Sequence, residues 1–231
     1  MVNPHYGVVF DLDDTLYLER DYVASGFRHV AARVASGRDA SAIYRYLWEG
    51  FRGGLRGGHF DRLLDQYPSI ADQWTVPELV SIYRCHCPKI TLRTGIAETL
   101  SKLRSAGVGL GVISDGAYWS QVQKARVLRL DALVDELVFT DSWGKEYWKP
   151  HARAFALMER RFALAPSKLV YVGDNPAKDF SGPHARGWAS IRLRTPGQLH
   201  ECVAATEPAP TWEVPSIESL SDLLMHIIRE P

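Results

Sequence analysis

Short, almost uninterrupted apolar runs recur along the chain, and a stretch with helical spacing follows each of them. These runs lie at 6–10, 108–113, 137–139 and 169–172. Apolar runs without alternation indicate strands that are buried on both faces of a parallel sheet. Between the runs, apolar residues recur three and four positions apart, as at Ile96, Leu100 and Leu103, and predict helices. This alternation predicts an α/β fold with a doubly wound parallel sheet of the Rossmann type.

One long segment departs from this alternation. Between residues 17 and 89 no buried strand can be recognised, and the apolar residues form helical stripes such as Val23, Phe27 and Val30. Glycines at 50, 53, 54, 57 and 58 separate these stripes. The sequence therefore predicts a core domain made of residues 1–16 and 90–231, with an all-helical domain, residues 17–89, inserted after the first strand.

The composition narrows the class of protein. The chain has 231 residues, 46% of them apolar, which is enough for a core domain with a smaller insertion. Lys plus Arg and Asp plus Glu both number 27, so no global charge favours nucleic acid or an anionic membrane. No apolar run approaches the ~20 residues that span a bilayer, and three cysteines argue against a disulfide framework. We expect a cytoplasmic protein without nucleic-acid or membrane partners, and the oligomeric state stays open.

Polar side chains follow three of the predicted strands at the point where each strand ends. They are Asp11, Asp13 and Thr15 after the first, Ser114 and Asp115 after the second, and Asp174, Asn175 and Asp179 after the fourth. Doubly wound sheets bind ligands at this edge, so we expect these side chains to lie close together. Two carboxylates ~4 Å apart repel by roughly 4 kcal/mol at an effective dielectric constant near 20, which calls for a cation or protonation. Oxygen ligands without nearby His or Cys favour Mg²⁺.

The spacing of Asp11 and Asp13 suggests a division of labour. Residues i and i+2 of an extended segment point to the same side, so both carboxyls can face one substrate. We expect Asp11 to attack phosphorus and form an aspartyl phosphate, and Asp13 to act as general acid and then as general base. Asp14 is expected to be an outward-facing turn residue with neither role.

Phosphoryl transfer also needs hydrogen-bond donors and a cation for the negative charge of the transition state. Ser114 and nearby backbone N–H groups are placed to hold phosphoryl oxygens. Lys149, directly before Pro150 and a predicted helix, is the preferred lysine, and Lys145 is the second candidate.

These residues together resemble the four motifs of the haloacid dehalogenase-like (HAD) superfamily of phosphohydrolases. In chain order they are Asp11-x-Asp13-x-Thr15, Ser114, Lys149-Pro150 and Gly173-Asp174 with Asp179. The resemblance implies that the helical insertion is a C1-type cap. It also implies Mg²⁺ bound by the Asp11 and Asp174 side chains and the Asp13 carbonyl, with Asp179, Thr15 and Asn175 in supporting contacts around it.

Asp115 departs from the pattern, because many members of the superfamily carry Asn at this position. Ser114, Asp115 and Lys149 are the expected phosphate-binding residues. If Asp115 contributes only its backbone N–H, little changes, whereas a side chain that faced the phosphate would repel it. The sequence leaves these two alternatives open.

The sequence as a whole predicts a Mg²⁺-dependent phosphatase that acts on a small soluble phosphomonoester, such as a sugar phosphate, a nucleotide or a similar metabolite. A phosphomutase that uses the same aspartyl phosphate remains an alternative, as does a phosphoacceptor or binding module that does not hydrolyse it. A dehalogenase is disfavoured because it would not need Asp13 or a metal. The identity of the substrate cannot be read from the sequence.

Overall fold

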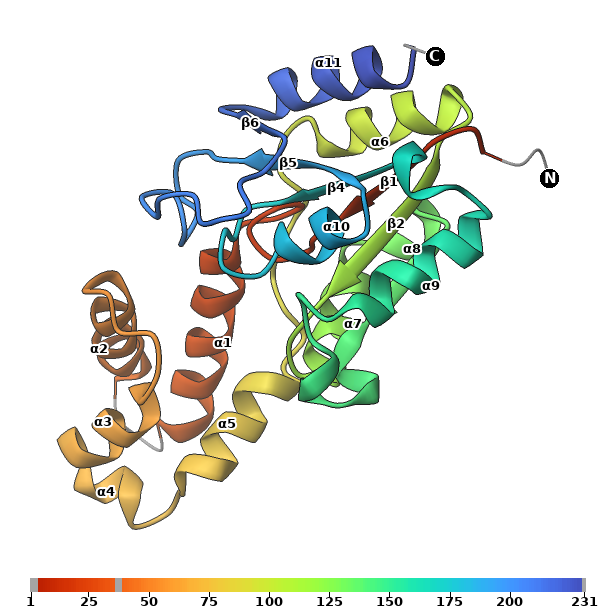
Figure 1. Cartoon of the computed structure of the whole chain (residues 1–231). Helices are drawn as coiled ribbons and strands as arrows, with labels where there is room; N and C mark the ends of the chain where they lie inside the picture. Colours follow the sequence, from red (N-terminus) through yellow and green to blue (C-terminus); the bar gives the residue numbers. More distant parts are fainter. Residues whose placement is uncertain (1–3, 36–38, 230–231) are drawn as a thin grey trace. The chain divides into compact units, whose positions relative to one another are not determined.

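The computed structural model describes residues 4–35 and 39–229 (Figure 1). By its internal contacts the chain divides into two compact units. The first contains Met1–Arg20 and Thr91–Pro231, and the second contains Asp21–Ile90. The sequence-based domains, 1–16 with 90–231 and 17–89, remain a prediction.

The first unit is built on a six-stranded sheet in the order β3-β2-β1-β4-β5-β6, with parallel neighbours throughout (Figure 1). The strands are β1 (Gly7–Phe10), β2 (Gly109–Ser114), β3 (Glu136–Phe139), β4 (Leu169–Gly173), β5 (Ala189–Leu193) and β6 (Trp212–Val214). Every residue of β1, β2 and β4 is buried, because helices cover both faces of the sheet. The prediction of a doubly wound α/β fold is confirmed.

Helices cover the two faces of this sheet. They are α6 (Ile96–Ser105), α7 (Tyr118–Val127), α8 (Leu130–Leu133), α9 (Ala152–Phe162), α10 (Ser181–Ala185) and α11 (Ile217–Ile227), with short 3-10 turns η1 (Thr140–Trp143), η2 (Lys145–Tyr147) and η3 (Pro166–Lys168). Helices α6 and α11 pack together on one face, and α9 and α10 pack together on the other (Figure 1). Phe155, Met158 and Phe162 of α9 are buried against Val9 and Tyr171 of the sheet, which forms the core of the unit.

The regular elements described within the second unit are all helical. Helix α1 (Glu19–Val34) begins in the first unit, and α2 (Ala40–Arg52), α3 (His59–Gln66), α4 (Pro68–Ala71) and α5 (Val76–Cys85) follow. Helix α3 contacts α2, α4 and α5, and their apolar faces bury Ile43, Leu47, Leu63 and Leu79. Across residues 4–35 and 39–229, no helix has both the length and the apolar character needed to cross a membrane.

Two strands, β5 and β6, were not predicted from the sequence. In β5 the apolar run is interrupted by Ser190 and Arg192, although both are buried in the structure. The Arg192 guanidinium satisfies its burial by donating to the carbonyl oxygens of His200 (2.9 Å) and Val203 (2.8 Å). Strand β6 is three residues long and gives almost no periodic signal.

Candidate functional site

The site lies where β1 and β4 run side by side. The chain leaves β1 toward β2 on one side, and it returns from β3 to β4 on the other, so the strand order reverses between β1 and β4. Asp11 directly follows β1, and its backbone N–H donates to the Val172 carbonyl of β4 (2.8 Å). Asp174 directly follows β4. Both aspartates therefore occupy the topological switch point at which α/β sheets bind ligands.

Lys149 joins the two strand ends. Its Nζ contacts Asp11 Oδ1 and lies 2.8 Å from both Asp179 Oδ1 and the Tyr171 hydroxyl. The side chain is fully buried. Burial alone would lower the pKa of Lys149, but the carboxylates of Asp11, Asp179 and Asp115 raise it above its usual range, so the ammonium stays charged.

The second lysine candidate is placed differently. Lys145 is exposed, and its Nζ lies 5.9 Å from the centre of the Trp148 ring rather than at the carboxylates. The geometry therefore favours Lys149 over Lys145.

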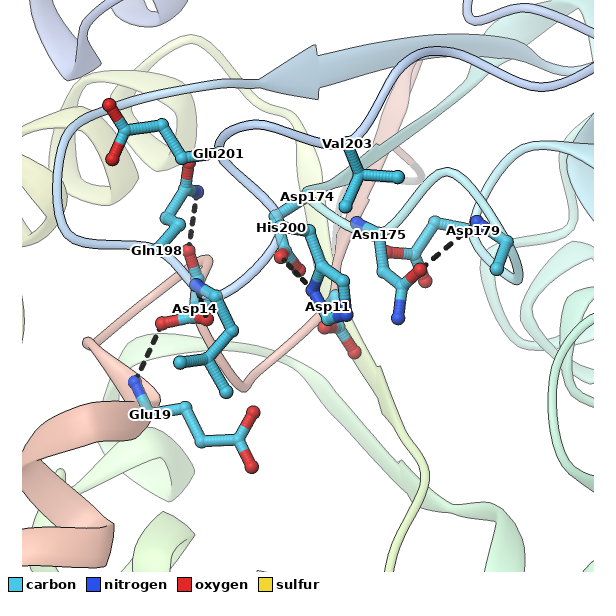
Figure 2. Close-up of polar contacts among 12 residues, drawn as sticks. Asp11, Asp14, Glu19, Asp174, Asn175, Asp179, Gln198, His200, Glu201 and Val203 are labelled. Atoms are coloured by element: carbon cyan, nitrogen blue, oxygen red, sulfur yellow. Dashed lines mark hydrogen bonds and ion pairs between the residues drawn. The ribbon is translucent and has the colours of Figure 1, made fainter. Parts of the chain in front are cut away.

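The carboxylates of this site can hold a cation. Oxygens of Asp11, Asp174 and Asp179 all lie within 4.8 Å of one another (Figure 2). Among the described residues, the buried Asp11 Oδ2 has no hydrogen-bond partner. Burial raises the pKa of Asp11 to about 8, Lys149 opposes this and the charge of Asp179 adds to it. Three carboxylates, those of Asp11, Asp174 and Asp179, thus lie together beside the two ammonium groups of Lys149 and Lys178, and a divalent cation would relieve their mutual repulsion.

Asp179 is the least suited of the three to bind that cation directly. Its Oδ1 accepts from Lys149, and its Oδ2 accepts from the backbone N–H of Asn175 (2.9 Å). Burial alone would raise the pKa of Asp179, but the Lys149 and Lys178 ammonium groups lower it. The oxygens best placed for a cation belong to Asp11 and Asp174, and Asp179 orients Lys149.

The Asp13 carboxylate is surrounded by donors. Its Oδ1 accepts from the Tyr17 hydroxyl and from Lys124 Nζ (2.6 Å), and its Oδ2 accepts from Gln121 Nε2 (2.6 Å). Burial alone would raise the pKa of Asp13, but the charge of Lys124 and the hydrogen bonds from all three donors lower it. This arrangement favours the ionised form, which is the form that acts as a base.

Ser114 and Asp115 lie at the end of β2, on the side of the site next to β1. The Ser114 hydroxyl lies 2.7 Å from Gln121 Nε2. The Asp115 Oδ1 accepts from the Thr140 hydroxyl (2.6 Å) and from the backbone N–H of Lys149 (3.1 Å). The Asp115 side chain therefore fixes the backbone that carries Lys149, and phosphate binding by Ser114 and Asp115 remains a prediction.

Asp14 faces inward, so the expectation of an outward-facing turn residue was wrong. Its side chain is buried, and its Oδ1 accepts from the backbone N–H of Glu19 at 2.7 Å (Figure 2). Its Oδ2 accepts from the backbone N–H of Leu199, also at 2.7 Å. With φ of 56° the residue adopts the left-handed conformation that Asp tolerates better than most residues. The short side chain can then satisfy two main-chain donors inside the turn.

Two supporting residues of the predicted set lie near this turn and the β4 loop. Thr15 is fully buried, and its hydroxyl has no partner among the described residues. The Asn175 side chain accepts from the backbone N–H of Ala177 (3.0 Å), which closes the loop after Asp174. Asn175 therefore reaches Asp179 through its main chain, and the role of Thr15 stays a prediction.

Sequence reasoning missed several residues of the site. His200 Nδ1 lies 3.0 Å from Asp174 Oδ2 (Figure 2), and this hydrogen bond raises the pKa of His200 against the effect of burial. No motif marks His200, because it lies in the irregular segment after β5. Gln121 and Lys124 did leave a signal, since they share the helical face of the buried Ala125 and Leu128. Two polar residues on an apolar face could have been recognised as partners of a buried polar group.

Comparison with known proteins identifies the family of the chain. The model of the haloacid dehalogenase-like hydrolase family matches residues 8–192. A glyceraldehyde 3-phosphate phosphatase of Methanopyrus kandleri is 27% identical over 234 residues, which cover 96% of this chain and 98% of that protein. Its namesake in Methanothermobacter thermautotrophicus is 30% identical and covers 81% of this chain and 85% of its own length.

A solved structure has the same fold. The HAD-hydrolase YfnB of Bacillus subtilis, bound to magnesium, superposes with a TM-score of 0.70 at 18% identity and covers 96% of this chain and 99% of its own. Because the family model covers most of the sequence, the chain belongs to the haloacid dehalogenase-like hydrolases. The interpretation of the sequence as a hydrolase of this superfamily is confirmed.

Proposed function

We propose that this protein is a Mg²⁺-dependent phosphatase that hydrolyses a small phosphomonoester of the sugar-phosphate class through an aspartyl phosphate on Asp11. The observation that carries the proposal is the buried Asp11 carboxylate, with one oxygen on Lys149 and the other without a partner among the described residues. The substrate class is supported by two relatives that are named glyceraldehyde 3-phosphate phosphatases.

In the first step an oxygen of Asp11 attacks phosphorus while the bond from phosphorus to the leaving oxygen breaks. Lys149 neutralises charge on the attacking carboxylate and on the phosphoryl oxygens beside it. The negative charge of the bound phosphate favours protonation of Asp13. The protonated Asp13 carboxyl then gives its proton to the leaving oxygen, so the alcohol departs as a neutral molecule. Ser114 donates to a phosphoryl oxygen.

In the second step the Asp13 carboxylate takes a proton from water, and the water oxygen attacks phosphorus. The bond between phosphorus and Asp11 breaks, inorganic phosphate leaves and the carboxylate of Asp11 is restored. The Asp11 and Asp174 carboxylates would hold Mg²⁺, with the Asp13 carbonyl as a further ligand. Bound there, Mg²⁺ supplies positive charge to the phosphoryl oxygens and fixes their orientation.

Removal of Mg²⁺ tests whether the release of phosphate depends on the metal ion. We expect inorganic phosphate to be released from members of a panel of sugar phosphates, nucleotides and small organic phosphates when Mg²⁺ is present. Chelation with EDTA should lower the rate by at least roughly 10²-fold, because Lys149 and Lys178 cannot balance the three carboxylates and the added phosphate without a metal ion. Readdition of Mg²⁺ should restore it. Absence of free phosphate across the whole panel contradicts the proposal, and an isomeric phosphate ester in its place would indicate a mutase.

Replacement of Asp13 by Asn should separate the two steps. The amide can neither give nor take the proton, so kcat should fall by about 10²- to 10⁴-fold. An aryl phosphate with a good leaving group can still phosphorylate Asp11, because its phenolate departs without a proton. The phosphorylated protein should therefore accumulate and be visible by intact-protein mass spectrometry.

The exposed Asp222 of α11 provides the matched control for this experiment. Asp222→Asn should turn over like the unchanged protein and show no stable phosphoprotein. Equal residual activity in Asp13→Asn and Asp11→Asn, with no phosphoprotein in either, would contradict the roles assigned to the two aspartates.

A further inference from the structure

Helix α7 presents two buried polar side chains to Asp13. Gln121 and Lys124, called the α7 pair below, lie three residues apart on one helical face and are 1% and 5% exposed. A buried ammonium group is costly unless it is paired, and the carboxylate of Asp13 is the partner of Lys124 at 2.6 Å. The reaction described above uses neither residue of the α7 pair.

The two residues of the α7 pair donate hydrogen bonds to different oxygens of the Asp13 carboxylate. Lys124 donates to Asp13 Oδ1, and the Gln121 amide donates to Asp13 Oδ2. The same amide nitrogen contacts the Ser114 hydroxyl at 2.7 Å and the Asp115 carbonyl oxygen. The α7 pair therefore ties the Asp13 carboxylate to the end of β2, where Ser114 is expected to meet the phosphate.

A general acid works only when its oxygen lies within hydrogen-bond reach of the atom that it protonates, about 2.6–3.2 Å. Asp13 follows the end of β1, and its side chain can rotate about two bonds. Donors on both of its oxygens restrict that rotation. Tyr17 donates from the loop that carries Asp13, whereas the α7 pair donates from a rigid helix that is separate from this loop. The restraint thus fixes Asp13 relative to the phosphate site.

We propose that Lys124, with Gln121, is a positioning residue that aims the Asp13 carboxyl at the leaving-group oxygen of the substrate. The inference rests on the proposed phosphatase function. In the first step the proton moves from Asp13 to the leaving oxygen as its bond to phosphorus breaks, and Lys124 keeps the resulting carboxylate in place. In the second step the same carboxylate, still held, removes a proton from water.

The test compares substrates that differ in their need for that proton. An alkoxide must be protonated as it leaves, whereas 4-nitrophenolate leaves without help. In Lys124→Met, kcat/KM for a primary alkyl phosphate should fall at least about tenfold more than kcat/KM for 4-nitrophenyl phosphate. This difference corresponds to losing part of the rate enhancement that general acid catalysis provides. A merely structural role of Lys124 would lower both values equally. An equal fall, or no fall in either, overturns the proposal.

Controls separate this outcome from misfolding and from failure of the proposed function. Lys102→Met makes the same chemical change at an exposed lysine of α6 and should leave the ratio of the two kcat/KM values unchanged. If circular dichroism shows that Lys124→Met is unfolded, the same ratio measured in Gln121→Met decides the question. Placed in the Asp13→Asn background, Lys124→Met should not change the ratio further. An unchanged protein that hydrolyses neither substrate nor any other phosphate ester contradicts the phosphatase proposal itself.

Discussion

Replacement of Asp11 by Asn should lower kcat by at least about 10⁴-fold, the scale of loss expected when a covalent nucleophile is removed. The amide of Asn is a poor nucleophile and cannot form the mixed anhydride with phosphate. It also removes a negative charge from the cation site at β1. Initial rates with the best substrate of the panel measure the loss, and intact-protein mass spectrometry should show no phosphorylated species.

The fold should survive this change, because Lys149 keeps its contacts with Asp179 and Tyr171. Circular dichroism and thermal unfolding check that point. Activity within about tenfold of the unchanged protein in Asp11→Asn would exclude the carboxylate as nucleophile, since general electrostatic effects of one charge are of that order. Slow recovery of activity on storage, with a mass that reverts to that of Asp, would indicate deamidation.

Replacement of Lys149 by Met should damage both activity and stability. We expect kcat/KM to fall by about 10³-fold or more, because a cation at the transferring phosphoryl group is worth that much in related chemistry. Asp11 and Asp179 would be left as neighbouring buried carboxylates, and loss of one partner from a buried ion pair costs about 3–5 kcal/mol of unfolding free energy. Steady-state kinetics and urea unfolding measure the two effects.

Lys145→Met is the matched control, because Lys145 is exposed and was the competing lysine from the sequence. This variant should retain its activity, and its unfolding free energy should stay within about 0.5 kcal/mol of the unchanged protein. The reverse result, with activity lost in Lys145→Met and kept in Lys149→Met, would mean that the wrong lysine was assigned to the site.

Strands β1, β2 and β4 could be predicted because their burial on both faces leaves a plain apolar run, as in 6–10 and 169–172. Strand β3 is only partly buried, but its short apolar run 137–139 was still recognisable. Strand β5 could not be predicted, because Arg192 takes a place that apolar residues normally fill. Its burial depends on carbonyl groups of residues 200 and 203, which are brought near only by the folded chain. Predictions from sequence periodicity assume that arginine is exposed to solvent. A buried arginine whose guanidinium group has all its hydrogen-bond partners therefore escapes them.

In the candidate site, too, the sequence predicted some features and left others to the folded structure. Asp11, Lys149 and Asp179 could be predicted to meet because each follows or precedes an element whose end faces the same edge of the sheet. The contacts around them depend on side-chain directions that no spacing specifies. The Asp14 side chain points inward because two backbone N–H groups donate to it there. The Asp13 carboxylate accepts from three donors, which come from its own loop and from α7. A motif therefore locates the reacting groups but not what holds them in place.

The pairing of β1 with β4 has a consequence for synthesis of the protein. Asp11 is made before the strand beside it, β4, and before Lys149, Asp174 and Asp179. Contacts between such distant segments form only after most of the chain is present. A nascent chain or a product of premature termination that stops before β4 thus carries Asp11 without β4, Asp174 and Asp179. Such fragments should be chemically inert, because the active centre can assemble only after β4, Asp174 and Asp179 have been made.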